Sequence, residues 1–129
     1  MADIEFLGLD EVLEIHRDQI ERYGGSAGIR DMGLLQSAVA MPAAGFGERY
    51  LHEDMSEMAA AYLFHITQNH PFVDGNKRTG AVAAIVFLEI NGVELNADED
   101  ELETLVRSVA TGQSDKVAVA VFFRHNCRK

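Results

Sequence analysis

One apolar segment limits the possible folds of this chain more than any other feature. Residues 81–88 read AVAAIVFL and belong to a predicted helix over residues 76–91. This helix begins after Gly75 and ends at Asn91-Gly92, a pair typical of a helix C-terminus. Because residues 81–88 leave no polar face, the helix is predicted to be the buried centre of the fold. At 129 residues, the chain is expected to form a single domain over residues 1–129.

The other predicted elements are helices with identifiable caps and stops. They cover residues 9–23, residues 33–41 with Asp31 as cap and Pro42 as stop, residues 56–69 starting at Ser56, residues 98–111 with an Asp98/Glu101 capping box, and a last helix capped by Ser114. Residues 42–54 hold two glycines and two aromatic residues and predict an exposed loop or hairpin. The alternation in residues 117–121 suits a strand equally, but the chain offers no convincing partner strand. The predicted fold class is therefore an all-α bundle around one buried central helix, with a flap loop.

Composition argues against several functional classes. The net charge is −10 and the basic residues are scattered except at Lys77-Arg78, so nucleic-acid binding is not expected. A small anionic ligand or a partner with a basic face fits this charge. No apolar run is long enough to span a membrane, and the first residues, MADIEF, do not resemble a secretion signal. Cys127 is the single cysteine. We therefore expect a cytoplasmic protein.

The ten residues from His70 to Thr79, HPFVDGNKRT, combine an imidazole, a carboxylate and two cations. Pro71 ends the preceding helix, so the His70 imidazole sits at a junction, where it could accept a proton from an alcohol. The alternative is a histidine that only bonds a carbonyl group, the role expected for His16, His52, His65 and His125. Phe72 is predicted to anchor the loop to the core.

The second half of the segment carries groups suited to phosphate. Asp74 either binds Mg²⁺ or caps the following helix. Gly75-Asn76 permits a turn whose amides bind phosphate, and Asn76 either caps the helix or contacts phosphate. Arg78 offers a planar fork and Lys77 a point charge. Two cations in a first helical turn oppose the helix dipole, which indicates an anionic ligand.

The candidate roles follow from these residue types. The predicted catalytic residues are His70, Asp74 and Arg78, the predicted phosphate-binding residues are Gly75, Asn76, Lys77 and Arg78, and the predicted metal ligand is Asp74. The spacing before Lys77 is not that of a P-loop. A zinc site is not expected either, because His65 and His70 are five residues apart and no cysteine lies near them.

This segment resembles the signature of the Fic/Doc family, matching nine of its ten positions, and similarity extends to ERYGGSAGIRDMGLL and NGVEL. The resemblance implies that His70 activates a target hydroxyl, that Asp74 holds Mg²⁺, and that Asn76 and Arg78 bind the phosphates of ATP. It also implies that the loop around residues 42–54 is the flap that positions the target segment.

Two departures from the adenylyl-transferring Fic pattern point to the Doc branch. Lys77 stands where that pattern has glycine, and Ala81 stands where it has a second arginine. Doc-like members are implied to bind ATP reversed and to transfer its terminal phosphate. In the other direction, Pro71, Asp74 and Gly75 are closer to Fic than to the most divergent Doc toxins, so AMP transfer remains an alternative.

The resemblance therefore implies a Doc-like toxin of a toxin–antitoxin system. Its expected substrates are Mg-ATP and a Ser or Thr hydroxyl of a protein, with a translation elongation factor as the implied target. An antitoxin polypeptide is a further expected partner, because the chain has no inhibitory [ST]xxxE[GN] helix of its own. Two other hypotheses are a non-catalytic binding module and an enzyme that removes such modifications.

Overall fold

The computed structural model describes residues 3–128. The elements, in order, are α1 (Leu9–Tyr23), α2 (Met32–Ala40), the 3₁₀ turn η1 (Met41–Ala43), β1 (Gly45–Phe46), β2 (Arg49–Tyr50), α3 (Met55–Asn69), α4 (Asn76–Ile90), β3 (Glu94–Leu95), α5 (Glu99–Ala110), α6 (Lys116–Asn126) and β4 (Cys127–Arg128). The two antiparallel strand pairs, β1–β2 and β3–β4, are two residues long. This arrangement confirms the predicted all-α fold class. No helix within residues 3–128 is long and apolar enough to cross a membrane.

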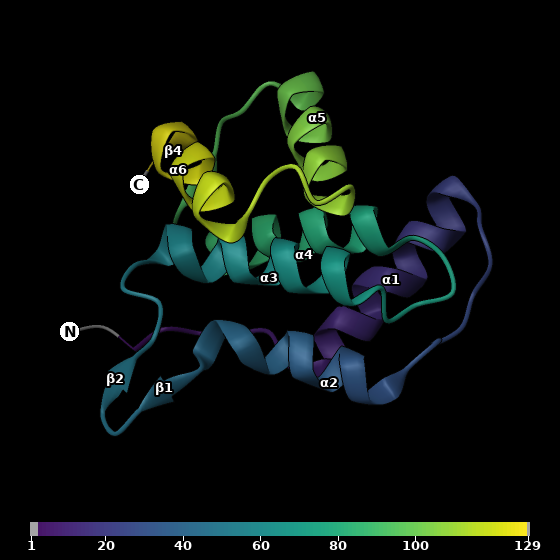
Figure 1. The fold of residues 1–129 in the computed structure, drawn as a ribbon, viewed down its shortest axis with the longest axis horizontal. Helices are drawn as coiled ribbons and strands as arrows, with labels where there is room; N and C mark the ends of the chain where they lie inside the picture. The colour runs from purple at the N-terminus through teal and green to yellow at the C-terminus, as the bar shows by residue number, and fades with distance from the viewer. Residues whose placement is uncertain (1–2, 129) are drawn as a thin grey trace.

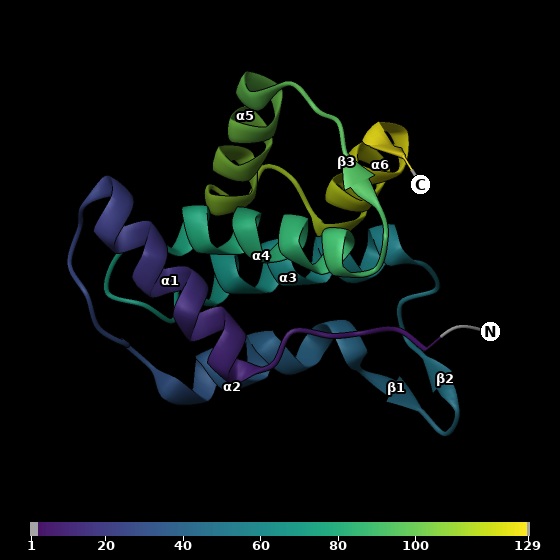
Figure 2. The same ribbon diagram turned by 180° about the vertical axis from the view of Figure 1, so that it is seen from behind.

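Helices α3 and α4 form the centre, with α1 and α2 on one side and α5 and α6 on the other (Figures 1 and 2). Gly80 on α4 lets the two central helices approach closely, because a Cβ there would lie 2.9 Å from Thr67 Oγ1 and 3.1 Å from the Leu63 carbonyl oxygen. The α4 residues Phe87 and Leu88 are fully buried, as predicted for a central helix. Helix α3 shares this position and is buried along most of its length.

Several predicted helix ends differ from the structure, including both ends of α2, which lie one residue earlier than predicted. Helix α3 begins at Met55 rather than Ser56, because the Asp54 side chain accepts a hydrogen bond from the Glu57 N–H. The last helix is capped by Asp115 rather than Ser114. Helix α2 ends at Ala40, and Pro42 lies within the 3₁₀ turn η1 that follows it. Residues 117–121 are helical as predicted, and residues 42–54 contain the predicted hairpin, β1–β2.

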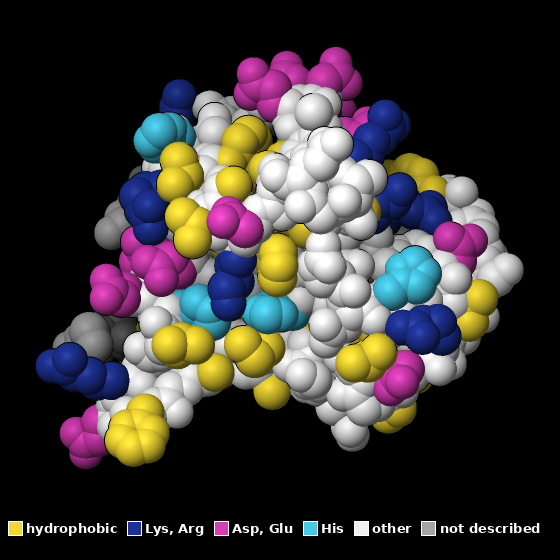
Figure 3. Space-filling model, viewed as in Figure 1, with side chains coloured by type: hydrophobic (Ala, Val, Ile, Leu, Met, Phe, Trp, Pro, Cys, Tyr) yellow, Lys and Arg dark blue, Asp and Glu magenta, His cyan; other side chains and the backbone are white. Residues whose placement is uncertain are grey.

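A cluster of two histidines and a lysine joins the loop after β2 to α3 and α6. The Lys116 ammonium nitrogen lies 3.1 Å from His52 Nε2 and 3.2 Å from His65 Nε2. Figure 3 shows a cationic side chain between two histidines on this face. Burial, followed by the charges of Lys116 and His52, lowers the pKa of His65 to about 4. Burial and Lys116 lower the pKa of His52 as well, while Glu57 acts in the opposite direction.

This cluster predicts loss of stability in mild acid. The unfolded chain protonates His65 near its ordinary pKa of 6.5, whereas the folded chain does so only near 4. Stability contributed by neutral His65 is therefore present above pH 6.5 and lost as the pH falls to 4. We expect His65→Gln to show a smaller fall in urea midpoint over this interval than the wild type. His125 is exposed on α6, so His125→Gln should behave like the wild type. An equal fall in urea midpoint with pH in all three proteins would contradict the prediction.

Candidate active site

The segment from His70 to Arg78 bends between α3 and α4. His70 and residues 74–78 line a cavity of about 500 Å³. His70 ends α3 in the left-handed region with φ 51°, and it is the one non-glycine residue with positive φ within residues 3–128. Such a conformation is strained and persists only where surrounding contacts impose it. It turns the exposed imidazole toward the cavity. Figure 3 shows a histidine and cationic side chains close together on this side of the molecule.

The Asn76 side chain holds the loop and the imidazole together. Its Oδ1 accepts from the Phe72 N–H at 2.9 Å, and its Nδ2 donates to the Phe72 carbonyl at 3.0 Å. The same Nδ2 lies 3.1 Å from His70 Nδ1. The two bonds to Phe72 fix the orientation of the amide, so Nδ2 is the donor toward His70. Asn76 therefore positions His70 and is almost completely buried.

Asp74 is an exposed carboxylate at the centre of the loop. Its Oδ2 accepts from the Ser26 N–H at 3.2 Å and its Oδ1 from the Gly75 N–H at 2.9 Å. These two backbone donors, with a smaller contribution from Arg78, hold the pKa of Asp74 below its ordinary value. Gly25 permits the approach of the neighbouring loop, since a Cβ there would lie 2.7 Å from Asp74 Oδ2.

The donor set is compatible with magnesium but not with a protein-only metal cage. Within residues 3–128, no three His, Cys, Asp or Glu side chains converge. Mg²⁺ bound with a nucleotide typically uses one or two carboxylates together with phosphate oxygens and water. The exposed carboxylate of Asp74, beside a cavity that Lys77 and Arg78 also line, meets that requirement.

Helix α4 begins at this cavity, and the backbone N–H groups of its first turn are available to bind a ligand. Gly75, with φ 77°, is the N-cap and supplies no side-chain cap, so Asp74 does not cap the helix in this structure. The Thr79 N–H is bonded to the Gly75 carbonyl at 2.9 Å, whereas the N–H groups of the turn before it lack carbonyl partners within an α-helix. Lys77 in this first turn is exposed and lines the cavity. Helix start and ammonium together favour an anion.

Arg78 lines the same cavity, but its guanidinium is turned partly toward α1. It donates to the Gly24 carbonyl at 3.0 Å and to the Gln19 carbonyl at 3.4 Å. The guanidinium carbon also lies 5.7 Å from the centre of the Tyr23 ring. These contacts occupy two of the five N–H groups, so part of the predicted phosphate fork is used to attach α4 to the end of α1.

Two further residues shape the site from distant parts of the sequence. His16 Nε2 lies 2.8 Å from the Asp74 carbonyl oxygen, and its ring stacks on Phe72 with 3.7 Å between centroids. This agrees with the structural role expected for His16. Arg30 was not predicted: it donates through Nε to the His70 carbonyl at 2.6 Å and through Nη2 to the Asn69 carbonyl at 2.9 Å. Arg30 lies in the glycine-containing loop before α2, and no sequence pattern in that loop indicates a contact with the end of α3.

We expect the two-pronged contact of Arg30 to stabilise the unusual backbone of His70. Arg30→Ala should cost about 1 kcal/mol of stability and lower the catalytic rate about tenfold. Arg30→Lys should recover little, because an ammonium cannot reproduce the planar fork. Arg17 on α1 is exposed, so Arg17→Ala serves as the matched control in urea unfolding and activity assays. Full activity of Arg30→Ala would contradict this role.

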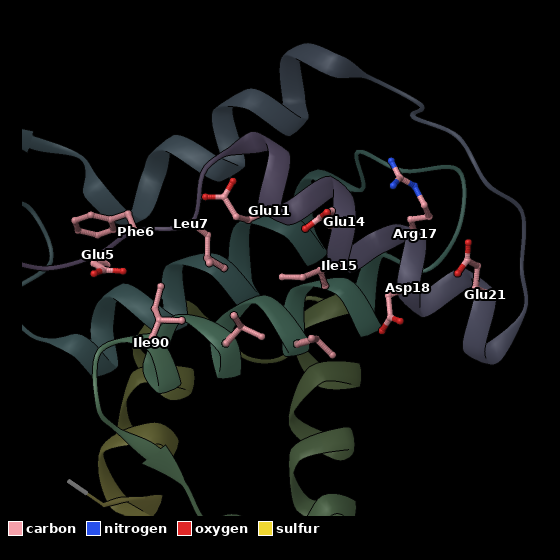
Figure 4. Close-up of a pocket in the computed structure, with 12 residues that line it drawn as sticks. Glu5, Phe6, Leu7, Glu11, Glu14, Ile15, Arg17, Asp18, Glu21 and Ile90 are labelled. Carbon is pink, nitrogen blue, oxygen red and sulfur yellow. The ribbon is translucent and has the colours of Figure 1, made fainter.

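A larger cavity of about 690 Å³ lies elsewhere, between α1 and α4. Figure 4 shows the acidic side chains of Glu11, Glu14, Asp18 and Glu21 along α1, with Ile15 directed between the helices. This acidic rim would repel phosphate. The cavity is lined by none of the residues predicted for the active site, and the smaller cavity at His70 is therefore the candidate site for the chemistry.

Sequence similarity relates the chain to a known protein family. The Fic/DOC family description matches residues 6–88. "Toxin Doc" of Mycolicibacterium smegmatis is 44% identical over 100 residues, which cover 76% of this chain and 77% of the relative. "Protein kinase doc" of Escherichia phage P1 is 34% identical over 111 residues, which cover 86% of each protein. The chain is therefore a member of the Fic/DOC family and is similar to its Doc proteins.

Proposed function

We propose that this protein is a Doc-type toxin that transfers the terminal phosphate of Mg-ATP to a Ser or Thr hydroxyl of a target protein. The observation that carries the proposal is one cavity lined by His70, Asp74 and the cationic start of α4. A proton acceptor, a metal-binding carboxylate and a phosphate-binding helix terminus are the groups required for phosphoryl transfer, which depends on positioning and charge neutralisation.

His70 is the proposed general base, acting through Nε2. In this structure Asn76 Nδ2 donates to Nδ1, which places the proton of the neutral ring on Nε2. If a phosphate oxygen accepts the Asn76 N–H instead, Nδ1 can carry the proton and Nε2 can accept another. Nucleotide binding and activation of His70 would thus be coupled through Asn76, which combines the two roles considered for that residue.

In the proposed step, the acceptor oxygen forms a bond to the terminal phosphorus while the bond to the bridging oxygen of ADP breaks. His70 takes the hydroxyl proton, and the N–H groups at the start of α4, Lys77 and the remaining donors of Arg78 neutralise the phosphate oxygens. Asp74 would hold Mg²⁺, which supplies further charge neutralisation to the phosphates.

Two observations favour phosphate over AMP as the transferred group. Lys77 places a long cationic side chain in the first turn of α4, where the adenylyl-transferring pattern has glycine, and Ala81 supplies no second arginine. The Escherichia phage P1 relative is named a protein kinase. Adenylyl transfer is the second candidate, because Pro71, Asp74 and Gly75 keep the Fic form of the signature.

The proposed partners follow the same branch of the family. The protein substrate is proposed to be a translation elongation factor, and the proposed regulator is a separate antitoxin polypeptide, since both similar proteins bear the name Doc and one is called a toxin. The proposed site of action is the cytoplasm, where such a target resides.

The decisive experiment is mass spectrometry of a purified elongation factor incubated with this protein, ATP and Mg²⁺. A mass gain equal to one phosphoryl group supports the proposal, and a gain equal to AMP supports the second candidate. Chelation of Mg²⁺ and Asp74→Asn should each abolish the gain. An unchanged target in the presence of intact, ATP-binding protein would reject this target, and transfer that needs no divalent ion would reject the role of Asp74.

A further inference from the structure

Lys116, the first residue of α6, has its side-chain nitrogen held between two imidazole rings. The nitrogen lies 3.1 Å from His52 Nε2 and 3.2 Å from His65 Nε2, and Figure 3 shows this arrangement on the molecular surface. An ammonium group only donates hydrogen bonds, so both Nε2 atoms are the acceptors. Two of the three N–H directions of Lys116 are therefore fixed by the two histidines.

The third direction is left for a ligand. Within residues 3–128, Lys116 forms no salt bridge and has no hydrogen-bond partner other than the two histidines. The side chain lines a cavity of about 190 Å³, to which Val117 and Ala120 contribute apolar surface and Arg124 a guanidinium. A small group that enters this cavity can therefore reach the nitrogen.

The surroundings favour the uncharged amine, which is the nucleophilic form of a lysine. Burial lowers the pKa of Lys116, and the charge of Glu57 acts in the opposite direction with a smaller effect. When the ammonium loses its third proton, the other two N–H groups can stay bonded to His52 and His65. The lone pair then takes the third direction, away from both imidazoles. The two histidines thus orient a nucleophile.

We propose that Lys116 is a modification site whose side-chain nitrogen is acylated by a small acyl phosphate. The lone pair of the nitrogen attacks the carbonyl carbon, and a C–N bond forms while the C–O bond to the phosphate breaks. The nitrogen becomes positively charged and acidic as the C–N bond forms, so Nε2 of His52 or His65 takes one of its protons. That proton then passes to the released phosphate through solvent.

The size and lining of the cavity select the donor. The cavity admits a small acyl group but not a bulky carrier, and the acyl product would lie against Val117 and Ala120. Arg124 bonds Asp54 through Nε and Nη2, so its Nη1 is the donor available to the leaving phosphate. None of the residues that line this cavity lines the one at His70, so the inference goes beyond the proposed function.

Acylation would change the cluster of His52, His65 and Lys116. The amide product keeps a single N–H, so it can bond only one of the two histidines. It also removes the charge that contributes to lowering the pKa of both rings. The link between the loop after β2, α3 and α6 would therefore lose one hydrogen bond, and both histidines would be protonated more readily.

The test compares Lys116 with Lys77, an exposed lysine of the same chain. The intact protein is incubated with acetyl phosphate at mildly alkaline pH, and mass spectrometry of its peptides follows the acetyl gain at each lysine. In the folded protein, Lys116 should react at least about tenfold faster than Lys77, since a positioned base typically contributes about 10²–10⁴-fold. In protein unfolded by urea, the two lysines should react at similar rates.

A variant tests the role of the imidazoles. His65→Gln should slow acetylation of Lys116 at least about threefold, because His52 remains as a second base, and should leave Lys77 unchanged. The matched control, His125→Gln, should change neither rate. A folded-state rate at Lys116 no higher than at Lys77, a rate unaffected by His65→Gln, or a phosphoryl gain on a histidine in place of the acetyl gain would each overturn the proposal. Should His65→Gln fail to fold in thermal unfolding, the comparison of folded with urea-unfolded wild type decides.

Discussion

Replacing His70 with alanine is expected to lower the rate of target modification about 10²–10⁴-fold, the usual contribution of a positioned general base. The imidazole is exposed at the cavity and its ring makes one hydrogen bond, to Asn76. Its removal should therefore leave the urea midpoint and the affinity for Mg-ATP close to those of the wild type. Single-turnover transfer from ATP to the purified target measures the rate, and calorimetry measures nucleotide binding.

The matched control is His125→Ala, which removes an exposed histidine from α6, remote from the candidate site. It should retain full transfer activity. The same pair of variants separates catalysis from a non-catalytic binding module. If expression of His70→Ala still arrests growth as the wild type does, toxicity depends on binding alone, and the enzymatic proposal loses its physiological role.

The predicted elements agree with the structure where the signal is local. The helix over residues 9–23 is delimited by its apolar spacing and by Gly24, and the structure has both ends at the predicted residues. The errors at Ser56 and Ser114 occur where two potential caps lie close together. Asp54 and Asp115 accept the capping hydrogen bonds, while the Ser114 hydroxyl is engaged 2.7 Å from that of Ser108. Apolar periodicity cannot choose between caps one or two residues apart.

The candidate site was predictable in composition but not in arrangement. The segment HPFVDGNKRT brings His70 and residues 74–78 to one cavity because a helix–loop–helix bend constrains them to be neighbours. The supports come from elsewhere in the chain. Arg30 clamps two carbonyls at the end of α3, and His16 meets the Asp74 carbonyl from α1. Such contacts depend on packing between helices distant in sequence, which residue spacing does not encode.

Arg78 shows why residue type alone overstates a role. A planar guanidinium beside a helix start predicts a phosphate fork, yet carbonyl oxygens of Gln19 and Gly24 occupy part of it. The carbonyl groups at the end of α1 carry partial negative charge and attract the cation. The residue therefore serves the packing of α1 against α4, and it also lines the cavity. Asn76 likewise holds the loop through Phe72 before it can serve a ligand.

Replacing Phe72 is expected to lower both stability and activity. Its side chain is fully buried and stacks on the His16 ring at an interplanar angle of 5°. Phe72→Ala should cost about 3–5 kcal/mol in the free energy of unfolding, because it removes a buried aromatic ring and leaves a cavity. Since a domain is typically stable by about 5–15 kcal/mol, the variant would be close to unfolding. Urea denaturation followed by circular dichroism measures the loss.

The neighbouring residue provides the control for this position. Val73 has half of its side chain exposed, at 51%, so Val73→Ala should change stability by less than about 0.5 kcal/mol. The milder Phe72→Leu keeps an apolar side chain and should fold, yet it loses the stacking on His16 that fixes the loop. A displacement of about 1 Å at reacting groups can cost about 10²-fold in rate. The transfer rate of Phe72→Leu should therefore fall by much more than its loss of stability would explain. If Phe72→Leu transferred phosphate as fast as Val73→Ala, the loop would be held by its backbone hydrogen bonds to Asn76 and Arg30 rather than by the buried ring.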